Sequence, residues 1–436
     1  MKLFPSKNKF FLLAYENFYF ILILLSTLIL PYFLYSIINL SLYAGTLINI
    51  FILFLYTLKK HGFNYIKFFV KNSLRFSSLI FIIILIQSLA AFHNFGGDFN
   101  RLFLSLILLI FFTFGSYLIA LNFESIDDYL LDFYIKAICI ILTLILIFGL
   151  IMRSINSDFL GIVNKQLIFF HEPSHFILVY SPVIFYTLAT ANYRFKLFIF
   201  TSLISLSYLL ESTTMFFMLT LGLIFLIPIR FLYYLVGSII LFLTYLIKIN
   251  CNFISTCSNI SNYYLSGLLS DYHFDRFFLT FNTLNLSAAS FLSGWEKAYL
   301  DFIYTSSWGV GFQQFGLVGP YALFNNKFAK EMNLSGPLNY NDGGSIAPKL
   351  ISEFGLLGIL TLLIYLLFFS SILRSLSDIS FSSTKKNYKN IFFQCIFVTS
   401  FIDIFIRGTG YFNPPVLLLL AACIWFYFKK YIYKSL

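Results

Sequence analysis

Runs of apolar residues recur along most of the chain, and short polar segments separate them. Each run has close to the roughly 20 residues that an α-helix needs to cross the apolar core of a bilayer. Backbone polar groups in lipid must be satisfied within a helix or a closed barrel. The pattern therefore predicts about twelve transmembrane helices. Their approximate bounds are 17–37, 42–58, 76–92, 102–121, 134–152, 174–190, 197–210, 215–229, 231–249, 350–373, 391–406 and 416–428.

The composition indicates the same class of protein. Hydrophobic residues make up 59% of the chain and charged residues only 11%, which is far from the balance of a soluble domain. The first apolar run follows Lys2, Lys7 and Lys9, but it is too long for the core of a signal peptide, so we expect it to remain. The predicted fold is an all-α integral membrane protein of about twelve transmembrane helices, with one large periplasmic loop that contains short helices.

The basic residues predict an orientation. Lys and Arg near helix ends are retained on the cytoplasmic side of a membrane. They concentrate in the segments that are cytoplasmic when both termini are inside, such as those with Lys59, Lys60, Lys385 and Lys386. The net charge of +11 therefore follows from topology, and we expect no nucleic-acid partner.

Polar residues are densest in one segment, 250–348, which lies outside under this topology. The chain is thereby divided into transmembrane helices in 1–249, a periplasmic loop in 250–348, and further transmembrane helices in 349–436. Cys251 and Cys257 lie at the start of the loop, where they form either a disulfide or two free thiols.

The stretch FFHEPSHF at 169–176 contains H-E-x-x-H, a zinc-protease motif when both histidines lie on one helix. Pro173 interrupts this arrangement, because proline has no backbone donor and disfavours helical geometry in the preceding Glu172. We expect Pro173 at the first helical position instead, with Glu172 beside the N-cap and His175 in the first turn. His171 then lies outside the helix, and we predict neither a metal nor another cofactor.

Four stretches in a fixed order indicate a family. FFHEPSHF is followed by LSYLLESTTM at 206–215, SGWEKAYLDFIYTSSWGVGFQQFG at 293–316 and NDGGSIAPKLISEFGLLGIL at 341–360. In this order the stretches resemble a Wzy-type O-antigen polymerase. The motif pattern covers about 153–360, and the layout of apolar runs is similar over the whole chain.

The resemblance implies a glycosyltransferase of lipopolysaccharide biosynthesis in the bacterial inner membrane, with its site facing the periplasm. Such an enzyme transfers a growing glycan from undecaprenyl pyrophosphate to the non-reducing end of a repeat unit on a second undecaprenyl pyrophosphate. The implied partners are undecaprenyl-pyrophosphate-linked oligosaccharides, membrane lipid and a chain-length regulator protein.

Glycosyl transfer from such a donor leaves an anionic pyrophosphate, which cations or helix N-termini stabilise. Arg153 ends a predicted span and is equally consistent with snorkelling at the interface. Arg407 is equally consistent with neutralising Asp403, four positions earlier. The candidate pyrophosphate ligands are the basic residues predicted on the outer side: Arg101, Arg153, Arg276, Arg407 and His273.

A base is also required to remove a proton from the acceptor hydroxyl. Glu172 is the first candidate, although a carboxylate near a helix start is also explained as a cap. His175 and His171 are alternatives for the same role. Asp342 is a further candidate for substrate binding, because it lies in the loop where the related O-antigen ligases have a histidine, although turn formation also explains it.

Two other functions remain open. An O-antigen ligase shares the fold and the lipid donor, but it is expected to have the loop histidine that NYNDGGSIAPK at 339–349 lacks. A polysaccharide flippase or another transporter is expected to have its polar residues within helices near the midplane of the membrane, and not mainly in one external loop.

Overall fold

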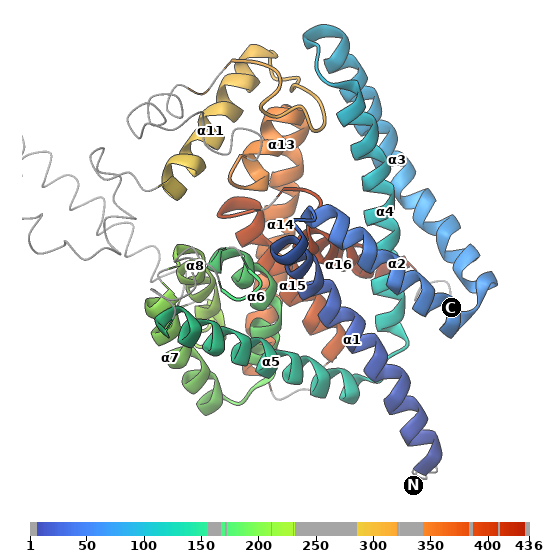
Figure 1. Cartoon of the computed structure of the whole chain (residues 1–436), viewed down its shortest axis with the longest axis vertical. Helices are drawn as coiled ribbons and strands as arrows, with labels where there is room; N and C mark the ends of the chain where they lie inside the picture. The colour runs from blue at the N-terminus through green and yellow to red at the C-terminus, as the bar shows by residue number, and fades with distance from the viewer. Residues whose placement is uncertain are drawn as a thin grey trace, which may run out of the picture.

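The computed structural model describes residues 7–155, 167–170, 172–210, 212–229, 231, 286–320, 322, 343–382, 387–408 and 410–431. In this part of the chain the secondary structure is helical apart from one isolated bridge between Leu167 and Phe170. Figure 1 shows the arrangement of the helices. They are α1 (Lys7–Ile38), α2 (Leu42–His61), α3 (Phe63–Phe95), α4 (Phe99–Glu124), α5 (Asp128–Ile155), α6 (Pro173–Thr190), α7 (Tyr193–Leu210), α8 (Thr213–Gly222), the 3-10 helix η1 (Leu223–Phe225), α11 (Leu286–Tyr304), α13 (Ile346–Phe354), α14 (Leu356–Phe381), α15 (Tyr388–Phe405) and α16 (Pro414–Tyr431).

Among the described residues, five helices are long and apolar enough to cross a membrane. They span Leu42–His61, Phe99–Glu124, Asp128–Met152, Tyr193–Leu210 and Leu356–Phe381. Shorter apolar stretches occur at Leu22–Ile38, Ile80–Phe95, Thr213–Phe225 and Pro414–Tyr427. The helical class expected from the sequence is confirmed, whereas the number of spans and the extent of the external loop stay predictions. The predicted span 231–249 lies outside the described residues except for its first position.

Helix α6 lies at the centre of the fold (Figure 1) and is buried on all sides, from Phe176 to Ala189. It packs against α15, and α5, α8 and α14 surround the pair. The apolar sequence of α6 has no polar face, which is typical of a helix enclosed by other helices. This central pair brings the start of α6 and the end of α15 to one place.

Small residues allow close helix crossings on the N-terminal side of the fold. A Cβ on Gly45 of α2 would lie 2.7 Å from the Cα of Pro31 in α1, and a Cβ on Gly115 of α4 would lie 2.6 Å from Ile50 in α2. Helix α4 also packs against α16. These crossings connect the N-terminal helices to the C-terminal part of the chain.

Helix α3 is longer than the predicted span 76–92. It begins at Phe63, directly after Gly62, whose φ of 77° makes a tight turn from α2. The basic residues Lys67, Lys71 and Arg75, expected in a connecting segment, therefore lie on the first turns of the helix. Charge limits a membrane span but does not prevent a helix from continuing, which explains the difference.

Two spans predicted as continuous helices are interrupted in the structure, so this part of the prediction was wrong. The span 350–373 breaks at Gly355, where φ is +55°, into α13 and α14. The span 215–229 is helical only to Gly222 and continues as η1. Ser377 of α14 is hydrogen-bonded to this second break: its hydroxyl accepts from the Ile229 N–H at 3.2 Å and donates to the Ile224 carbonyl at 3.4 Å. Both breaks depend on tertiary contacts, which cannot be predicted from the pattern of apolar residues.

Candidate functional site

The first turn of α6 forms one side of the candidate site. Glu172 is the N-cap residue with extended backbone angles, and Pro173 is in the first turn, which confirms the expected helix start. The Glu172 side chain makes no capping hydrogen bond. Instead, its Oε2 accepts a hydrogen bond from the Ser174 hydroxyl at 2.9 Å. The carboxylate is therefore available for a role other than capping.

The turn after α15 supplies the opposite charge. Arg407 Nη2 donates to Glu172 Oε2 at 2.8 Å, and the Arg407 and Glu172 side chains are 15% and 43% exposed. The Arg407 N–H donates to the Ile402 carbonyl at 2.9 Å, which fixes the backbone of the turn. The structure thus brings together two of the residues predicted from the sequence, and it gives Arg407 a partner other than the Asp403 suggested by spacing.

This pairing affects the protonation of the carboxyl group. Burial alone would raise the pKa of Glu172, but the Arg407 guanidinium, with smaller effects from His175 and the Ser174 hydroxyl, holds that pKa below its ordinary value. Glu172 is therefore ionised at neutral pH. The His175 ring lies in the same turn of α6, with its centroid 5.8 Å from the Tyr32 ring of α1.

A glycine turn before α13 supports the Arg407 turn. The Gly408 N–H donates to the Gly344 carbonyl at 3.1 Å. Gly343 and Gly344 both have positive φ, of 68° and 70°, which side chains rarely adopt. Helix α11 approaches the same turn closely, because a Cβ on Gly294 would lie 2.1 Å from the Gly343 carbonyl oxygen. The double glycine of the NDGGS stretch thus connects α11 and α13 to the Glu172–Arg407 pair.

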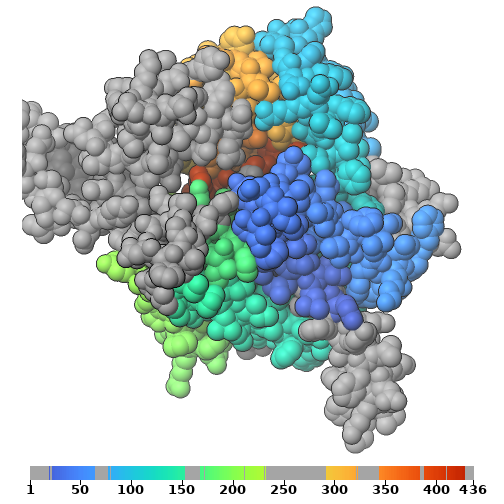
Figure 2. All heavy atoms as spheres, in the orientation of Figure 1, coloured from blue at the N-terminus to red at the C-terminus, as the bar shows by residue number. Residues whose placement is uncertain are grey.

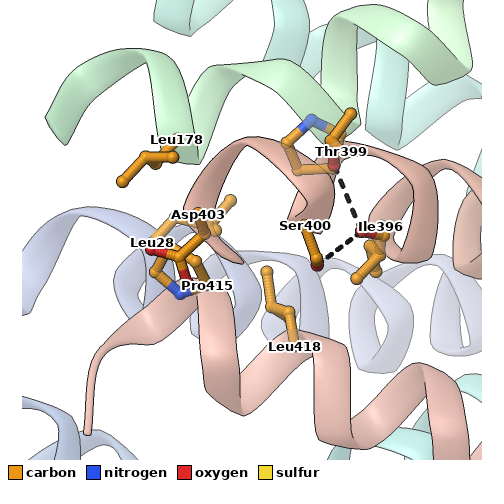
Figure 3. Close-up of a pocket in the computed structure, with 9 residues that line it drawn as sticks. Leu28, Leu178, Ile396, Thr399, Ser400, Asp403, Pro415 and Leu418 are labelled. Carbon is orange, nitrogen blue, oxygen red and sulfur yellow. Dashed lines mark hydrogen bonds between the residues drawn. The ribbon is translucent and has the colours of Figure 1, made fainter. Parts of the chain in front are cut away.

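Close to the end of α15, the helices α1, α6, α15 and α16 line a cavity of about 10 Å³, enough for about one water molecule (Figure 3). Asp403, which is 1% exposed, lines the cavity. The hydroxyls of Thr399 and Ser400 donate to carbonyls of their own helix, including that of Ile396 at 3.2 and 2.7 Å. The remaining lining residues are Leu28, Leu178, Pro182, Pro415 and Leu418. The cavity is thus mainly apolar, with one carboxyl group.

The pair is recessed relative to the ends of α3, α4 and α14. The rings of Phe405 and Tyr365 are 6.3 Å apart, so the end of α15 is level with Tyr365. Tyr365 lies about 14 Å along α14 from Leu356 at the helical rise of 1.5 Å per residue. Figure 2 shows a hollow in the surface where C-terminal residues, in red, are visible between the blue, green and orange segments.

The other predicted site residues are not placed at this pair. Arg101 lies near the start of α4, where its N–H donates to the N-cap Asp98 at 3.1 Å, and Figure 1 shows this end of α4 far above the centre of α6. Arg153 belongs to the last turn of α5, and its side chain is not described. The remaining candidates lie outside the described residues: His171, His273, Arg276 and Asp342.

Sequence reasoning missed the residues that hold the pair in place. Ser174 and the Gly344–Gly408 contact were not among the candidates, although the double glycine and Gly408 are turn signals. Within the described ranges, no group of three or more His, Cys, Asp and Glu side chains is arranged to hold a metal ion.

The fold and its apolar helices define an α-helical membrane protein. The chain matches no family model, no curated protein and no solved structure. Function is therefore inferred from the site and from the sequence stretches.

Proposed function

We propose that the protein is a Wzy-type O-antigen polymerase, a glycosyltransferase that uses a polyprenyl-pyrophosphate-linked donor. The observation that supports this most strongly is the pair of Glu172 and Arg407, recessed at the start of α6 and the end of α15. It combines a carboxylate with a guanidinium, which are the two groups that transfer from a pyrophosphate donor requires.

In the proposed reaction, the bond between the anomeric carbon of the donor glycan and the pyrophosphate oxygen breaks, and the pyrophosphate leaves with the electron pair. The acceptor hydroxyl oxygen forms the new bond to that carbon, and its proton passes to Glu172. Arg407 meets the charge that develops on the pyrophosphate, since a planar guanidinium forms bidentate contacts with phosphate.

The ion pair suggests how binding of the donor activates the base. While Arg407 contacts Glu172, it lowers the pKa of the carboxyl and makes the carboxylate a weak base. A pyrophosphate competes for the same guanidinium. When Arg407 turns to the pyrophosphate, only the smaller effects of His175 and the Ser174 hydroxyl oppose the effect of burial on Glu172, so the pKa of the carboxyl rises and Glu172 becomes a stronger base. Glu172 is thus proposed as the catalytic base, and His175 as the alternative.

Deletion of the gene tests this proposal in the organism. A strain without a polymerase attaches single repeat units to the lipid core, because the flippase and the ligase still act. A strain without a ligase or a flippase has no repeat units on the core. A silver-stained lipopolysaccharide gel is expected to show one band above the core in the deletion strain and a ladder after complementation. Full-length chains in the deletion strain would contradict the polymerase assignment.

One structural observation favours transport as the second candidate. The helix interruptions at Gly222 and Gly355 resemble the discontinuous helices of transporters, which often surround a substrate site. Among transporters, a flippase for the lipid-linked repeat unit is the candidate most consistent with the sequence. The same gel separates the two candidates, because loss of a flippase leaves the lipid core without any repeat unit.

A further inference from the structure

Helix α11 has three charged residues, of which Lys297 and Asp301 are buried and Glu296 is partly buried. Lys297 and Asp301 are 2% and 0% exposed. Lys297 Nζ donates to Asp301 Oδ1 at 2.6 Å, and also to the carbonyls of Val318 at 2.7 Å and Pro320 at 3.0 Å. The Ser352 hydroxyl of α13 donates to the other oxygen of Asp301. The charges are thus satisfied inside the protein and not by water.

The opposite side of the helix is aromatic and exposed. Within 291–308, all of the exposed residues are uncharged. Apart from Ser306 they are large and form what we name the α11 aromatic face: Tyr299 (64% exposed), Ile303 (57%), Tyr304 (51%) and Trp308 (51%). A helix that faces water has the reverse arrangement, with charges outside and aromatic residues inside. The α11 aromatic face therefore requires an apolar partner.

The α11 aromatic face is continuous with the apolar surface of α14. The Leu356 N–H, at the start of α14, donates to the Ser307 carbonyl at 2.9 Å, next to Trp308. Leu356, Leu357 and Leu360 are 61%, 44% and 53% exposed, on a helix that is long and apolar enough to cross a membrane. The surface that faces lipid on α14 thus extends onto the C-terminal end of α11.

The depth of this region also points to lipid. Helix α14 has 26 residues, and its length of about 39 Å exceeds the roughly 30 Å of the apolar core, so α14 extends into the headgroup region at one end or at both. The Trp308 carbonyl accepts a hydrogen bond from the Gln87 side chain at 3.0 Å, two turns before the end of α3. The 309–316 segment, which is non-helical, is buried within protein, as membrane depth requires.

We propose that α11 is an interfacial helix whose aromatic face lies in the leaflet around the start of α14. Tyr and Trp prefer this headgroup level, because their rings are apolar and their polar atoms contact water. Interfacial helices bury their apolar face to a depth of about 5–10 Å. The partner is thus the lipid surface itself, and this inference is independent of the proposed function.

Fluorescence quenching tests the proposal on the full chain in lipid vesicles. The chain has three tryptophans, so Trp295→Phe with Trp425→Phe leaves Trp308 as the only indole. Phospholipids brominated near the headgroup end of the acyl chains are expected to quench Trp308 at least about twofold, whereas iodide on both sides of the membrane has little effect. Trp295→Phe with Trp308→Phe is the matched control, because it leaves Trp425, which is 8% exposed and stacked on Phe393.

Two results would overturn the proposal. Quenching by iodide without quenching by brominated lipid would show that the α11 aromatic face contacts water. Protection from both quenchers would show that protein covers it, either a second copy of this chain or another part of the same chain.

A second measurement needs no substitution. A phospholipid with a photoreactive group near its headgroup is crosslinked to the unchanged protein, and the labelled peptides are identified by mass spectrometry. Peptides with Tyr304 or Trp308 are expected to be labelled together with those that contain Leu356. Labelling of the Leu356 peptide without any label on α11 would contradict the proposal.

Discussion

Arg407 and Glu172 lie 235 positions apart in the chain, yet their side chains are 2.8 Å apart. The sequence identified each of them separately, because Pro173 indicates the start of a helix and Arg407 interrupts an apolar run. It did not predict their contact, because the only partner that spacing suggested for Arg407 was Asp403, four positions earlier. Such a pairing depends on how α6 and α15 pack, and a local pattern contains no information about it.

The two charges are expected to be necessary for polymer formation in cells. Arg407→Ala and Glu172→Gln each remove one of them, and Arg407→Lys keeps the charge but loses the planar fork. Each variant is expected to reduce polymer by about a hundredfold or more, since loss of one stabilising donor in a preorganised site has this effect. The measurement is the lipopolysaccharide ladder of complemented strains at equal protein levels. Arg374→Ala is the control, because Arg374 is exposed near the other end of α14, and a normal ladder is expected from it.

The pH dependence of stability gives a separate test of the pair. The pKa of Glu172 lies below its ordinary value of 4.5 in the folded protein. The stability that the pair contributes is therefore present above pH 4.5 and is lost as the pH falls through the lower folded value. The difference in melting temperature between the wild type and Glu172→Gln is expected to be constant from neutral pH to about pH 5 and to disappear in stronger acid. A difference that persists well below the folded pKa would contradict the ion pair.

At the level of individual helices, the sequence did not predict the break between α13 and α14. The sequence contains Gly355, but a glycine within an apolar run is often tolerated in a continuous helix. In the structure a Cβ at this position would lie 1.9 Å from the Ser307 carbonyl oxygen, and the positive φ of the residue turns the chain. The contact with Ser307 therefore determines the break, and it involves a segment that the sequence places in a different region.

Gly355→Ala is expected to destabilise the protein more than a matched substitution. Both Gly355 and Gly62 have positive φ, but nothing lies within 4 Å of a Cβ on Gly62. Gly62→Ala thus has only the conformational cost of about 1–3 kcal/mol, whereas Gly355→Ala also displaces the Ser307 backbone. Thermal unfolding in detergent measures both. Equal melting temperatures for the two variants would contradict the close contact at Gly355.

The buried pair of Lys297 and Asp301 attaches α11 to α13 and to the 318–320 segment. Burial raises the pKa of Asp301, although Lys297 and Ser352 oppose the rise. Lys297→Met or Asp301→Asn alone leaves one buried group without its partner, and each is expected to destabilise the protein by about 3–5 kcal/mol. The double variant is expected to lose much less than the sum, which a double-mutant cycle of unfolding free energies measures. Additive losses would show that the two groups do not act as a pair.

On the scale of the whole molecule, composition was sufficient to predict an α-helical membrane protein, because burial of a backbone in lipid leaves few other folds. The limits of some helices were also predicted to within a few residues, namely those of α2, α4, α6, α7, α15 and α16. The recess above the Glu172–Arg407 pair was not predicted. It results from the unequal heights of α14 and α15 and from the reversal at Gly355, which only the packing of the helices determines.

Reconstitution of the purified protein tests the central claim most directly. The protein in vesicles is supplied with undecaprenyl-pyrophosphate-linked repeat units, and both the glycan length and the free undecaprenyl pyrophosphate are measured. The wild type is expected to form polymer and to release one undecaprenyl pyrophosphate for each linkage, whereas Arg407→Ala and Glu172→Gln form almost none. Repeat units that remain single with folded wild-type protein, or polymer from both variants at the wild-type rate, would contradict a glycosyl-transfer site at Glu172 and Arg407.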